Sequence, residues 1–455
     1  MKQLFRFSLL LLAILLPALA TAHDFEVDGI YYKINGNEAT VTFKGRYCNS
    51  FYDEYSGSVV IPATVTYNET TYPVTSIDAL AFFWCTEMTS IVIPNSLTEI
   101  GQEAFARCPG LANIVVESGN PRYDSRNNCN AIIETTDNTL IVGCKNTTIP
   151  NSVTAIGHFA FEGCTEMTSI VIPNSVTEIG FYAFESCTEL TSVYIPNSVT
   201  EIGYGAFDIC TGLTSIVVES GNPRFDSRDN CNAIIETADN TLIIGCKNTT
   251  IPNSVTEIGY GAFDSCTGLT SINLGNSVTS IGDWAFDKCE RLTSIDIPNS
   301  VTKIGDGAFY YCDGLTNIVI PNSVTSIGDS AFYDCWRLKD VYCYIADLSR
   351  VSSGDRLFYL SRLAYSGRTL HVLLGTADAY LADENWYPYF GQIVDDLKPD
   401  VLGDVNGDLE VNIADVNAVI NQILSGNYTA TGDVNGDGEV SIADVNAVID
   451  IILDK

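Results

Sequence analysis

Hydrophobic and polar positions along most of this chain follow one pattern that returns every 23 residues. The repeated unit is close to C-T-x-L-T-S-I-x-I-P-N-S-V-T-x-I-G-x-x-A-F-x-x, and copies run from about Thr75 to Cys343. Within it, L-T-S-I-x-I-P alternates apolar and polar residues as a half-buried strand does, and Pro then ends the strand. The V-T-x-I-G part is expected to turn the chain, with Gly at the bend.

Two sets of side chains in each unit are expected to point into a common core. The first and last residues of each I-x-I strand face inward, because side chains alternate along a strand: Ile91/Ile93, Ile170/Ile172, Val193/Ile195, Ile216/Val218, Ile272/Leu274, Ile295/Ile297 and Ile318/Ile320. The A-F pair returns a Phe to the core from the other side: Phe82, Phe105, Phe161, Phe184, Phe207, Phe263, Phe286, Phe309 and Phe332.

The copies must stack, because a unit of this size cannot bury its own apolar face. The stretch IPNSVTEIGYGAFD occurs identically at residues 195–208 and 251–264, as expected when each copy contacts similar neighbours. Parallel stacking spaces strands by about 4.7–4.9 Å, so identical side chains form columns. The sequence therefore predicts a β-rich solenoid over residues 75–344, with parallel strands on its concave face.

Two insertions of 33 residues interrupt the repeat, within residues 117–153 and 219–255. The two segments differ at four positions only: Tyr123/Phe225, Asn127/Asp229, Thr136/Ala238 and Val142/Ile244. In each, two apolar runs flank a polar turn, AIIET followed by TLIVGC or TLIIGC. This arrangement predicts one added β-hairpin per insertion.

The middle residue of each I-x-I strand is expected to face outward, onto the concave sheet. These residues are mostly apolar and partly aromatic, and an exposed apolar patch often marks a contact site. The alternative is that β-branched residues suit strands on either face. We favour a ligand-binding face, formed by Val92, Val115, Val171, Tyr194, Val217, Asn273, Asp296, Val319 and Tyr342.

Most of the fifteen cysteines are expected to be small buried hydrophobes rather than disulfide partners. Nine of them occupy one phase of the repeat: Cys85, Cys108, Cys164, Cys187, Cys210, Cys266, Cys289, Cys312 and Cys335. The others are Cys48, Cys129, Cys144, Cys231, Cys246 and Cys343. Cys129/Cys144 and Cys231/Cys246 have the same spacing, which leaves open two disulfide bridges.

The composition changes after Pro399, where GDVNGDLEVNIADVNAVINQIL (403–424) recurs as GDVNGDGEVSIADVNAVIDIIL (432–453). Each copy carries oxygen-bearing residues at loop positions 1, 3, 5, 7, 9 and 12, with the backbone carbonyl acting at position 7, and Ca²⁺ needs six to eight oxygens. Ser441 is expected to act through a water. We therefore predict two calcium sites, from Asp404, Asn406, Asp408, Glu410, Asn412 and Asp415, and from Asp433, Asn435, Asp437, Glu439, Ser441 and Asp444.

An amphipathic helix is expected to follow each of these loops. Apolar residues recur there at helical spacing: Val416/Val419/Ile420/Ile423 and Val445/Val448/Ile449/Ile452. The module has too few residues for a large core, so calcium should supply part of its folding free energy.

The first 22 residues are typical of a secretory signal peptide. Lys2 and Arg6 precede an apolar run at Phe7–Leu16, and small residues at 18–22 offer cleavage sites. No later stretch is long enough to span a membrane. The mature protein is therefore expected to be secreted or held at the cell surface.

The formal net charge of −33 disfavours nucleic acid and anionic membrane surfaces, which need basic patches. The chain has three histidines, His23, His158 and His371, and none pairs in the sequence with a plausible nucleophile or has zinc-site spacing. No phosphate-binding Gly-rich loop occurs, because the glycines recur once per repeat, at the bends. These observations favour a protein that is not an enzyme.

The repeat resembles the BspA-like leucine-rich repeat over about residues 24–394, with HDFEVDGIYYKI as an N-terminal β cap and Leu370 to Val394 as the closing segment. The resemblance implies a leucine-rich-repeat solenoid in a cell-surface or secreted protein, and several members of this family are linked to adhesion or to binding of host proteins.

Residues 402–454 resemble a type I dockerin, which implies a small helical calcium-binding domain that docks onto a cohesin-like partner. Three features depart from that pattern. Leu409 stands where the calcium loop prefers Gly, which weakens the first site. Ile413-Ala414 and Ile442-Ala443 replace the hydroxyl residues that cohesins usually read, and Asn421-Gln422 replaces a common basic pair.

The sequence thus predicts a secreted or cell-surface adhesin or recognition subunit that binds a host protein or glycan through the solenoid and a cohesin-like protein through the dockerin-like module. Two alternatives are a hydrolytic component with its site in residues 345–398 and a passive surface scaffold. The predicted segments are a signal peptide (1–22), an N-terminal β cap (23–74), the solenoid (75–344), a C-terminal capping segment (345–398) and the dockerin-like module (399–455).

Overall fold

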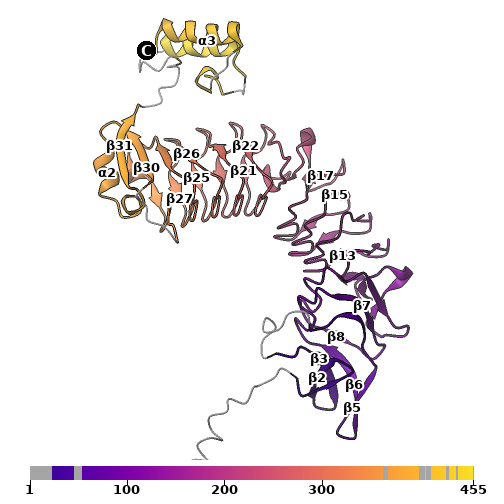
Figure 1. Cartoon of the computed structure of the whole chain (residues 1–455). Coiled ribbons are helices and arrows are strands. Elements are labelled where there is room, and N and C mark those ends of the chain that lie inside the picture. The colour runs from indigo at the N-terminus through magenta and orange to yellow at the C-terminus, as the bar shows by residue number, and fades with distance from the viewer. Residues whose placement is uncertain are drawn as a thin grey trace, which may run out of the picture. The chain divides into compact units, whose positions relative to one another are not determined.

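The computed structural model describes residues 23–45, 54–361, 367–398, 405, 411–426, 430–436 and 439–453 (Figure 1). The predicted signal peptide and Cys48 lie outside these residues. The chain divides between Gly212 and Leu213 into two compact units. Within the described residues, no helix is both long enough and apolar enough to cross a membrane.

The N-terminal unit begins with the predicted β cap. Strands β1 (Phe25–Val27), β2 (Ile30–Asn35) and β3 (Glu38–Thr42) are antiparallel, and β5 (Thr64–Tyr67) is antiparallel to β6 (Thr70–Ile77). The β6 strand then pairs in parallel with both β3 and β8 (Glu99–Ile100), so the cap leads directly into the repeats.

Each repeat forms one coil with two strands rather than the single strand expected from the sequence. The I-x-I strands of the N-terminal unit are β7 (Met88–Ile93), β9 (Asn113–Val116) and β15 (Ser192–Ile195), and β4 (Gly57–Val60) pairs in parallel with β7. The T-x-I residues, expected to be a turn, form a second parallel ladder from β13 (Ala155–Ile156), β14 (Glu178–Ile179) and β16 (Glu201–Ile202).

The Gly after each T-x-I strand keeps this second ladder closely spaced. The Gly180 amide donates to the Ile156 carbonyl at 2.8 Å, and a Cβ at Gly180 would lie 2.6 Å from the His158 amide nitrogen. A side chain would therefore push neighbouring coils apart.

Both insertions form the predicted hairpins. In the first, β10 (Tyr123–Asp124), the 3₁₀ helix η1 (Arg126–Asn128), β11 (Ile132–Glu134) and β12 (Thr139–Val142) follow β9, and β12 joins β13 in parallel. The second has the same order, β18 (Phe225–Asp226), η2 (Arg228–Asn230), β19 (Ile234–Glu236) and β20 (Thr241–Ile244).

The strand expected at Ile170/Ile172 does not form, and Ile170 is only half-buried. The preceding I-x-I strand in the sequence is β9, whose Val116 amide donates to Ser125 of the first insertion at 3.0 Å. The insertion thus occupies the place where the next coil would continue the ladder. The predicted continuous sheet of I-x-I strands is therefore wrong at this point.

The C-terminal unit contains a longer second ladder, in which β20 is followed by β21 (Glu257–Ile258), β23 (Ser280–Ile281), β25 (Lys303–Ile304), β27 (Ser326–Ile327) and β29 (Ser352–Ser353). Its I-x-I strands are β17 (Ser215–Val218), the pair β22 (Ser271–Asn273) and β24 (Ser294–Asp296), and the group β26 (Asn317–Ile320), β28 (Asp340–Cys343), β30 (Thr369–Leu373) and β31 (Gln392–Leu397). Short helical turns, η3 (Leu348–Arg350), α2 (Ala377–Leu381) and η4 (Tyr387–Tyr389), lie in the C-terminal capping segment.

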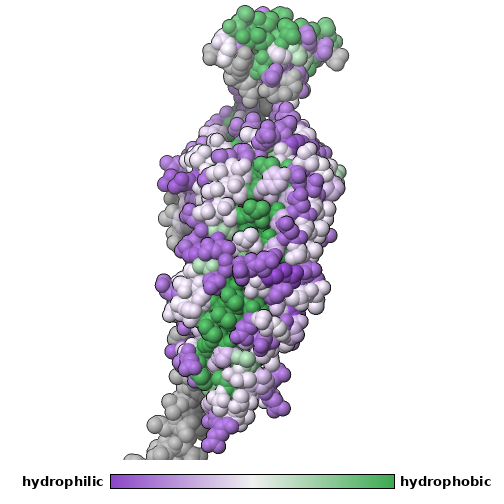
Figure 2. Space-filling model, turned by 90° about the vertical axis from the view of Figure 1, so that its right-hand side faces the viewer, coloured by the Kyte–Doolittle hydropathy of each residue, from purple (hydrophilic) through white to green (hydrophobic). Residues whose placement is uncertain are grey.

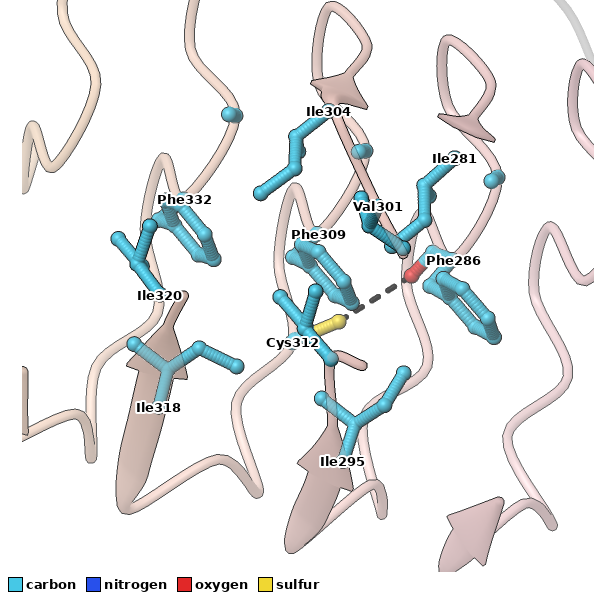
Figure 3. Close-up of a cluster of buried hydrophobic side chains, with 14 of the residues drawn as sticks. Ile281, Phe286, Ile295, Val301, Ile304, Phe309, Cys312, Ile318, Ile320 and Phe332 are labelled. Atoms are coloured by element: carbon cyan, nitrogen blue, oxygen red, sulfur yellow. Dashed lines mark hydrogen bonds between the residues drawn. The ribbon is translucent and has the colours of Figure 1, made fainter. Parts of the chain in front are cut away.

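The predicted core is confirmed. The Phe of every coil is buried, and successive rings stack, as Phe286 and Phe309 do with centroids 5.3 Å apart and planes 2° from parallel (Figure 3). The paired inward residues of the I-x-I strands are buried as well, Ile170 excepted. Burial of such side chains stabilises a fold by about 1.5–3 kcal/mol each.

None of the fourteen described cysteines forms a disulfide. Those at the repeat phase are buried, except Cys266, which is half-buried. Cys129 and Cys144, for which a bridge was left open, direct their thiols to different carbonyls, of Ala131 and Asn130.

Aromatic side chains close the Phe column at its ends. The Tyr55 ring lies 4.6 Å from that of Phe82, the first repeat Phe. In the closing segment, Trp386 and Phe390 pack on Phe358, with centroids 5.6 and 5.0 Å away. The buried guanidinium of Arg368 donates to three backbone carbonyls there, including that of Phe358 at 2.7 Å.

The C-terminal module consists of α3 (Ile413–Ser425), the short turn η5 (Ala430–Gly432) and α4 (Ile442–Leu453). Val416, Val419, Val445 and Val448 form its buried core, as predicted. Ile420, Ile423, Ile449 and Ile452 pack around that core and are half-buried.

Candidate binding surface and candidate calcium sites

The outward residues of the I-x-I strands stand side by side because the strands pair in parallel without offset. In the N-terminal unit, Val60 pairs with Val92, and Val92 pairs with Val115. In the C-terminal unit, Asn273 pairs with Asp296, and Val319 pairs with Tyr342. We call these outward residues the strand column.

Most side chains of the strand column are exposed. Tyr194 in β15 is 49% exposed, and Val171, which has the same repeat position in the coil where no strand forms, is 81% exposed, although such side chains usually lie inside a protein. Val115, Val217, Asn273, Asp296 and Val319 are also exposed, whereas Val92 and Tyr342 are half-buried. Figure 2 shows hydrophobic residues gathered in an elongated patch, bordered by hydrophilic ones, on the drawn face of the N-terminal unit.

Three residues of this column were missed by the sequence analysis. Val60 is 57% exposed and precedes Val92 in the column. Its segment, SVVIP, matches the I-x-I-P pattern and lies just before the first assigned repeat. At the other end, His371 pairs with Tyr342, and Val394 pairs with His371.

Charge and aromatic character differ along the strand column. In the N-terminal unit it is apolar from Val60 to Val171, and in the C-terminal unit it includes the acidic Asp296. At its end, the ring of His371 stacks on Tyr342 with centroids 4.6 Å apart, and its Nδ1 lies 2.7 Å from an oxygen of Asp396. The column therefore offers both apolar contact and hydrogen-bonding groups to a ligand.

A charged cluster lies away from the strand column, beside the Phe stack. Arg107 contacts Glu162 at 2.8 Å and Glu185 at 3.1 Å, and its guanidinium lies over the Trp84 ring. Burial, and then the negative charge of Glu185, raise the pKa of Glu162 to about 7, and the nearby Arg107 offsets this only in part. One carboxylate oxygen of Glu162 is buried without a hydrogen-bond partner in the described structure.

The last predicted ligand of each calcium loop is a fully buried carboxylate at the start of a helix. Asp415 accepts hydrogen bonds from the amides of Val405 at 2.8 Å and Asn412 at 3.0 Å. Asp444 accepts them from Asn435 at 3.0 Å and Ser441 at 2.8 Å. These carboxylates fold each loop back onto the helix that follows it.

The two loops start their helices in the same way. The Asn412 side chain accepts a hydrogen bond from the Ala414 amide at 2.8 Å, and Ser441 accepts one from Ala443 at 3.1 Å. Gly426, in the left-handed conformation, ends α3. The repeated sequence thus starts α3 and α4 with the same side-chain cap at loop position 9.

Seven of the twelve predicted calcium ligands lie in the described structure: Asn412, Asp415, Asp433, Asn435, Glu439, Ser441 and Asp444. Asp404, Asn406, Asp408, Glu410 and Asp437 lie outside it. Among the described residues, no group of three or more His, Cys, Asp or Glu side chains is placed to hold a metal ion. The donor set of carboxylate, amide, hydroxyl and carbonyl oxygens nevertheless fits Ca²⁺, which prefers oxygen ligands.

Comparison with known protein families agrees with this architecture. The model of the BspA type leucine rich repeat region matches in six copies, over residues 48–134, 141–236 and 243–361, which is more than half of the chain. The chain belongs to the BspA type leucine-rich repeat family. Residues 402–453 of this leucine-rich repeat protein match the Dockerin type I domain.

The family assignments carry general functional statements. Dockerin type I domains bind calcium and dock onto cohesins, which supports Ca²⁺ in general as a ligand of this module. BspA type repeats together with a dockerin are typical of extracellular or cell-surface proteins.

Solved structures similar to this leucine-rich repeat protein include three bacterial proteins. A leucine rich cell surface protein from Faecalibacterium prausnitzii A2-165 is 25% identical, with 82% of this chain and 95% of that chain covered and a TM-score of 0.47. A leucine-rich repeat protein from Bacteroides ovatus ATCC 8483 is 26% identical, with 82% and 76% covered and a TM-score of 0.37. The pneumococcal vaccine antigen PcpA is 19% identical, with 82% and 98% covered and a TM-score of 0.47. No curated protein matches the chain.

Proposed function

We propose that this protein is an exported recognition subunit that binds a host protein or glycan through the strand column and docks onto a cohesin-like partner through its C-terminal module. The observation that carries the proposal is the exposure of the strand column. Val171 and Tyr194 present apolar and aromatic surface to solvent, although a monomeric protein gains no stability from this. Repeat proteins commonly use such extended strand surfaces for binding.

Substitutions on the strand column test the recognition role. Tyr194→Asp combined with Val217→Asp places two charges on the proposed contact surface, so attachment to host proteins or glycans should weaken by about tenfold or more. Both side chains are exposed, at 49% and 42%, so the fold should survive. Tyr260→Asp is a matched control, because Tyr260 is 50% exposed but follows the second ladder instead. Attachment that is unchanged in the double variant would place the contact elsewhere.

We propose that the docking surface is apolar and that α3 and α4 each carry one copy of it. Ile413 and Ile442 are 68% and 69% exposed at equivalent helix starts, where cohesins usually read hydroxyl residues. Leu424 and Leu453, at the equivalent helix ends, are 80% and 76% exposed. An apolar cohesin-like surface therefore fits this module better than one that reads hydroxyl groups.

Because the two helices are equivalent, single and double substitutions should differ. Ile413→Asp or Ile442→Asp alone leaves one helix start intact, and calcium-dependent capture of the full chain on a cohesin panel should persist. The double variant should lose capture while its calcium-dependent melting shift remains. Capture that survives the double variant would remove these two residues from the docking surface.

The alternative function is a hydrolytic component whose catalytic site lies in residues 345–398. The feature of the structure that favours it is His371, which contacts Asp396 at 2.7 Å and lies 3.5 Å from Asp340. Turnover of polysaccharide or peptide by the purified chain, lost in His371→Ala, would establish this alternative and remove the proposal that the protein is not an enzyme.

A further inference from the structure

The first insertion leaves a cavity of about 530 Å³ in the N-terminal unit. It lies between the coil of residues 100–106 and the coil of residues 155–160, which would be neighbours in an uninterrupted repeat. Arg122, Tyr123 and Glu134 of the insertion complete its wall. None of these residues belongs to the strand column, so the cavity is separate from the surface discussed above.

Backbone groups that pair in other coils are left unpaired across this cavity. In other coils, the backbone amide of the third residue after the T-x-I strand donates a hydrogen bond to a carbonyl of the next coil. Leu80 donates in this way to the Gln102 carbonyl at 3.1 Å, and Phe159 to the Phe181 carbonyl at 3.0 Å. The corresponding groups here are the Glu103 amide and the His158 carbonyl. Neither has a hydrogen-bond partner in the part of the chain that the structure describes.

The cavity is closed at its inner end. The amide of Arg107 donates to the Glu162 carbonyl at 2.9 Å, which restores the contact between the two coils. The carbonyl of Ala160, just before Phe161, accepts a hydrogen bond from the Gly143 amide of the insertion at 2.7 Å. In other coils, the equivalent carbonyl accepts this bond from the preceding coil, as the Ala104 carbonyl does from the Phe82 amide. The two coils therefore diverge from this point outward, and unpaired polar groups face the opening.

Two aromatic rings present a face to this cavity. His158 stacks on Phe181 with centroids 4.9 Å apart, and Phe159 stacks on Tyr182 with centroids 5.5 Å apart. Both partners belong to the following coil. The preceding coil has Gln102 and Glu103 at these positions, so the opposite faces of His158 and Phe159 carry no ring and line the cavity.

Polar side chains surround the two rings. The carboxylates of Glu103 and Glu178 make no hydrogen bond or ion pair with any described residue, and both line the cavity. Arg122 is paired with Glu134 at 2.9 Å, which leaves the cavity with a net negative charge. A ligand that fits must combine an apolar face with several hydroxyl or amine donors, and it cannot be an anion.

An extended peptide fits less well than a sugar ring. A peptide that extends a sheet needs a free strand edge. The Thr98 carbonyl at the edge of β8 already accepts a hydrogen bond from Arg122 at 2.9 Å, and Tyr123 Oη lies 3.4 Å away. The C–H face of a sugar, by contrast, packs on an aromatic ring while its hydroxyls reach carboxylates and backbone groups.

We propose that this cavity is a binding subsite for a neutral or amino sugar of a glycan chain. The sugar packs on the open faces of His158 and Phe159. Its hydroxyls donate to Glu103 and to the His158 carbonyl, and one hydroxyl oxygen accepts from the Glu103 amide. The insertion thus adds a second recognition site to the solenoid, one with a defined ligand class.

Calorimetric titration of the full chain with oligosaccharides tests this proposal. The probes are neutral oligomers of glucose, mannose and xylose, an oligomer of glucosamine and, as the anionic arm, an oligomer of galacturonic acid. We expect at least one neutral or amino oligomer to bind and the anionic one not to bind. Phe159→Ala should weaken binding by about tenfold or more.

Trp284→Ala is the matched control, because Trp284 occupies the same repeat position as Phe159, with the same backbone φ of 58°, in a coil far along the sequence. It should leave binding unchanged. Binding of none of the neutral or amino probes would overturn the proposal, as would equal binding by a folded Phe159→Ala variant. Binding of poly-lysine that Phe159→Ala abolishes would assign the cavity to a peptide instead.

Discussion

The thiol of Cys312 donates a hydrogen bond to the backbone carbonyl oxygen of Phe286, which lies 3.2 Å away in the preceding coil (Figure 3). The same contact recurs along the solenoid, from Cys187 to Phe161, Cys210 to Phe184, Cys289 to Phe263 and Cys335 to Phe309, at 3.1–3.3 Å. The Cys side chain is small and apolar, so it fits the space between two coils, and its S–H group is a weak donor that gives the buried carbonyl a hydrogen-bond partner. The repeat therefore favours Cys over Ala or Val at this phase.

Removal of one such thiol should cost measurable stability. Cys312→Ala deletes the donor and leaves a small void in a fully buried site, so the free energy of unfolding should fall by about 1–2 kcal/mol. Cys266→Ala is the matched control, because Cys266 is half-buried and its sulfur lies 3.9 Å from the Gly245 carbonyl. Urea unfolding of both variants measures the difference. Equal losses would show that the hydrogen bond contributes nothing.

The buried thiols should be unreactive in the native protein. Burial raises the pKa of Cys335 to about 12 and that of Cys343 to about 11, so neither forms the reactive thiolate near pH 8. We expect the repeat-phase thiols other than Cys266, and Cys129, Cys144, Cys231 and Cys246, to react with iodoacetamide only after unfolding in denaturant without reductant. Mass spectrometry of the alkylated peptides would detect any of them held in a disulfide, and none of the described cysteines is in one.

The sequence predicts the core of this protein well because one repeated pattern determines it. Every coil faces similar neighbours, so the phase of Phe309 or Ile318 follows directly from the repeat, and both are buried. The same holds for the hairpins, where apolar runs flank a polar turn. The helices of the C-terminal module follow from apolar spacing in the same way.

The features that the sequence did not predict depend on contacts between coils. The second ladder uses only two residues per coil, such as Glu178–Ile179, which is too short for an alternating pattern to be recognised. The missing strand at Ile172 follows the first insertion, but β22 forms after the second insertion, so an insertion in the sequence does not by itself predict the loss. The cavity beside Phe159 likewise requires knowledge of which backbone groups remain unpaired after that insertion.

The stability of the N-terminal unit should depend on pH through Glu162. Its pKa is raised from 4.5 to about 7, so the folded protein holds this proton more tightly than the unfolded chain. The resulting stability is present in full below about pH 4.5 and is lost as the pH rises toward 7. Glu162→Gln keeps a polar side chain beside Arg107 and cannot ionise. The difference in unfolding free energy between pH 5 and pH 8 should therefore shrink by about 2 kcal/mol.

A neighbouring exposed carboxylate provides the control for this measurement. The Glu166 side chain is 60% exposed and pairs with Lys145 at 2.7 Å. Glu166→Gln removes one negative charge at an exposed position, so it controls for the change in net charge. A parent-like pH profile in Glu162→Gln would show that the buried carboxyl is stabilised in its charged form by Arg107.

Calcium should stabilise the C-terminal module, because its valine core is small and the last predicted ligands, Asp415 and Asp444, are fully buried and hold backbone amides of the loops before them. Ligand binding to the folded state alone raises the melting temperature with concentration. We expect millimolar calcium to raise the melting temperature of the 400–455 fragment, and Asp404→Ala combined with Asp433→Ala to abolish the shift. Asp450→Asn changes an exposed residue of α4 and should keep it.

The two sites should differ in affinity, because Leu409 replaces the loop Gly in the first and Gly438 retains it in the second. Asp433→Ala alone should therefore remove the tighter phase of a calcium titration, and Asp404→Ala alone the weaker one. Leu409→Gly should bring the two phases together, because a Gly at this position permits the sharp turn that the loop needs. A parent fragment whose melting temperature does not respond to calcium would contradict both assigned sites, whatever the single variants do.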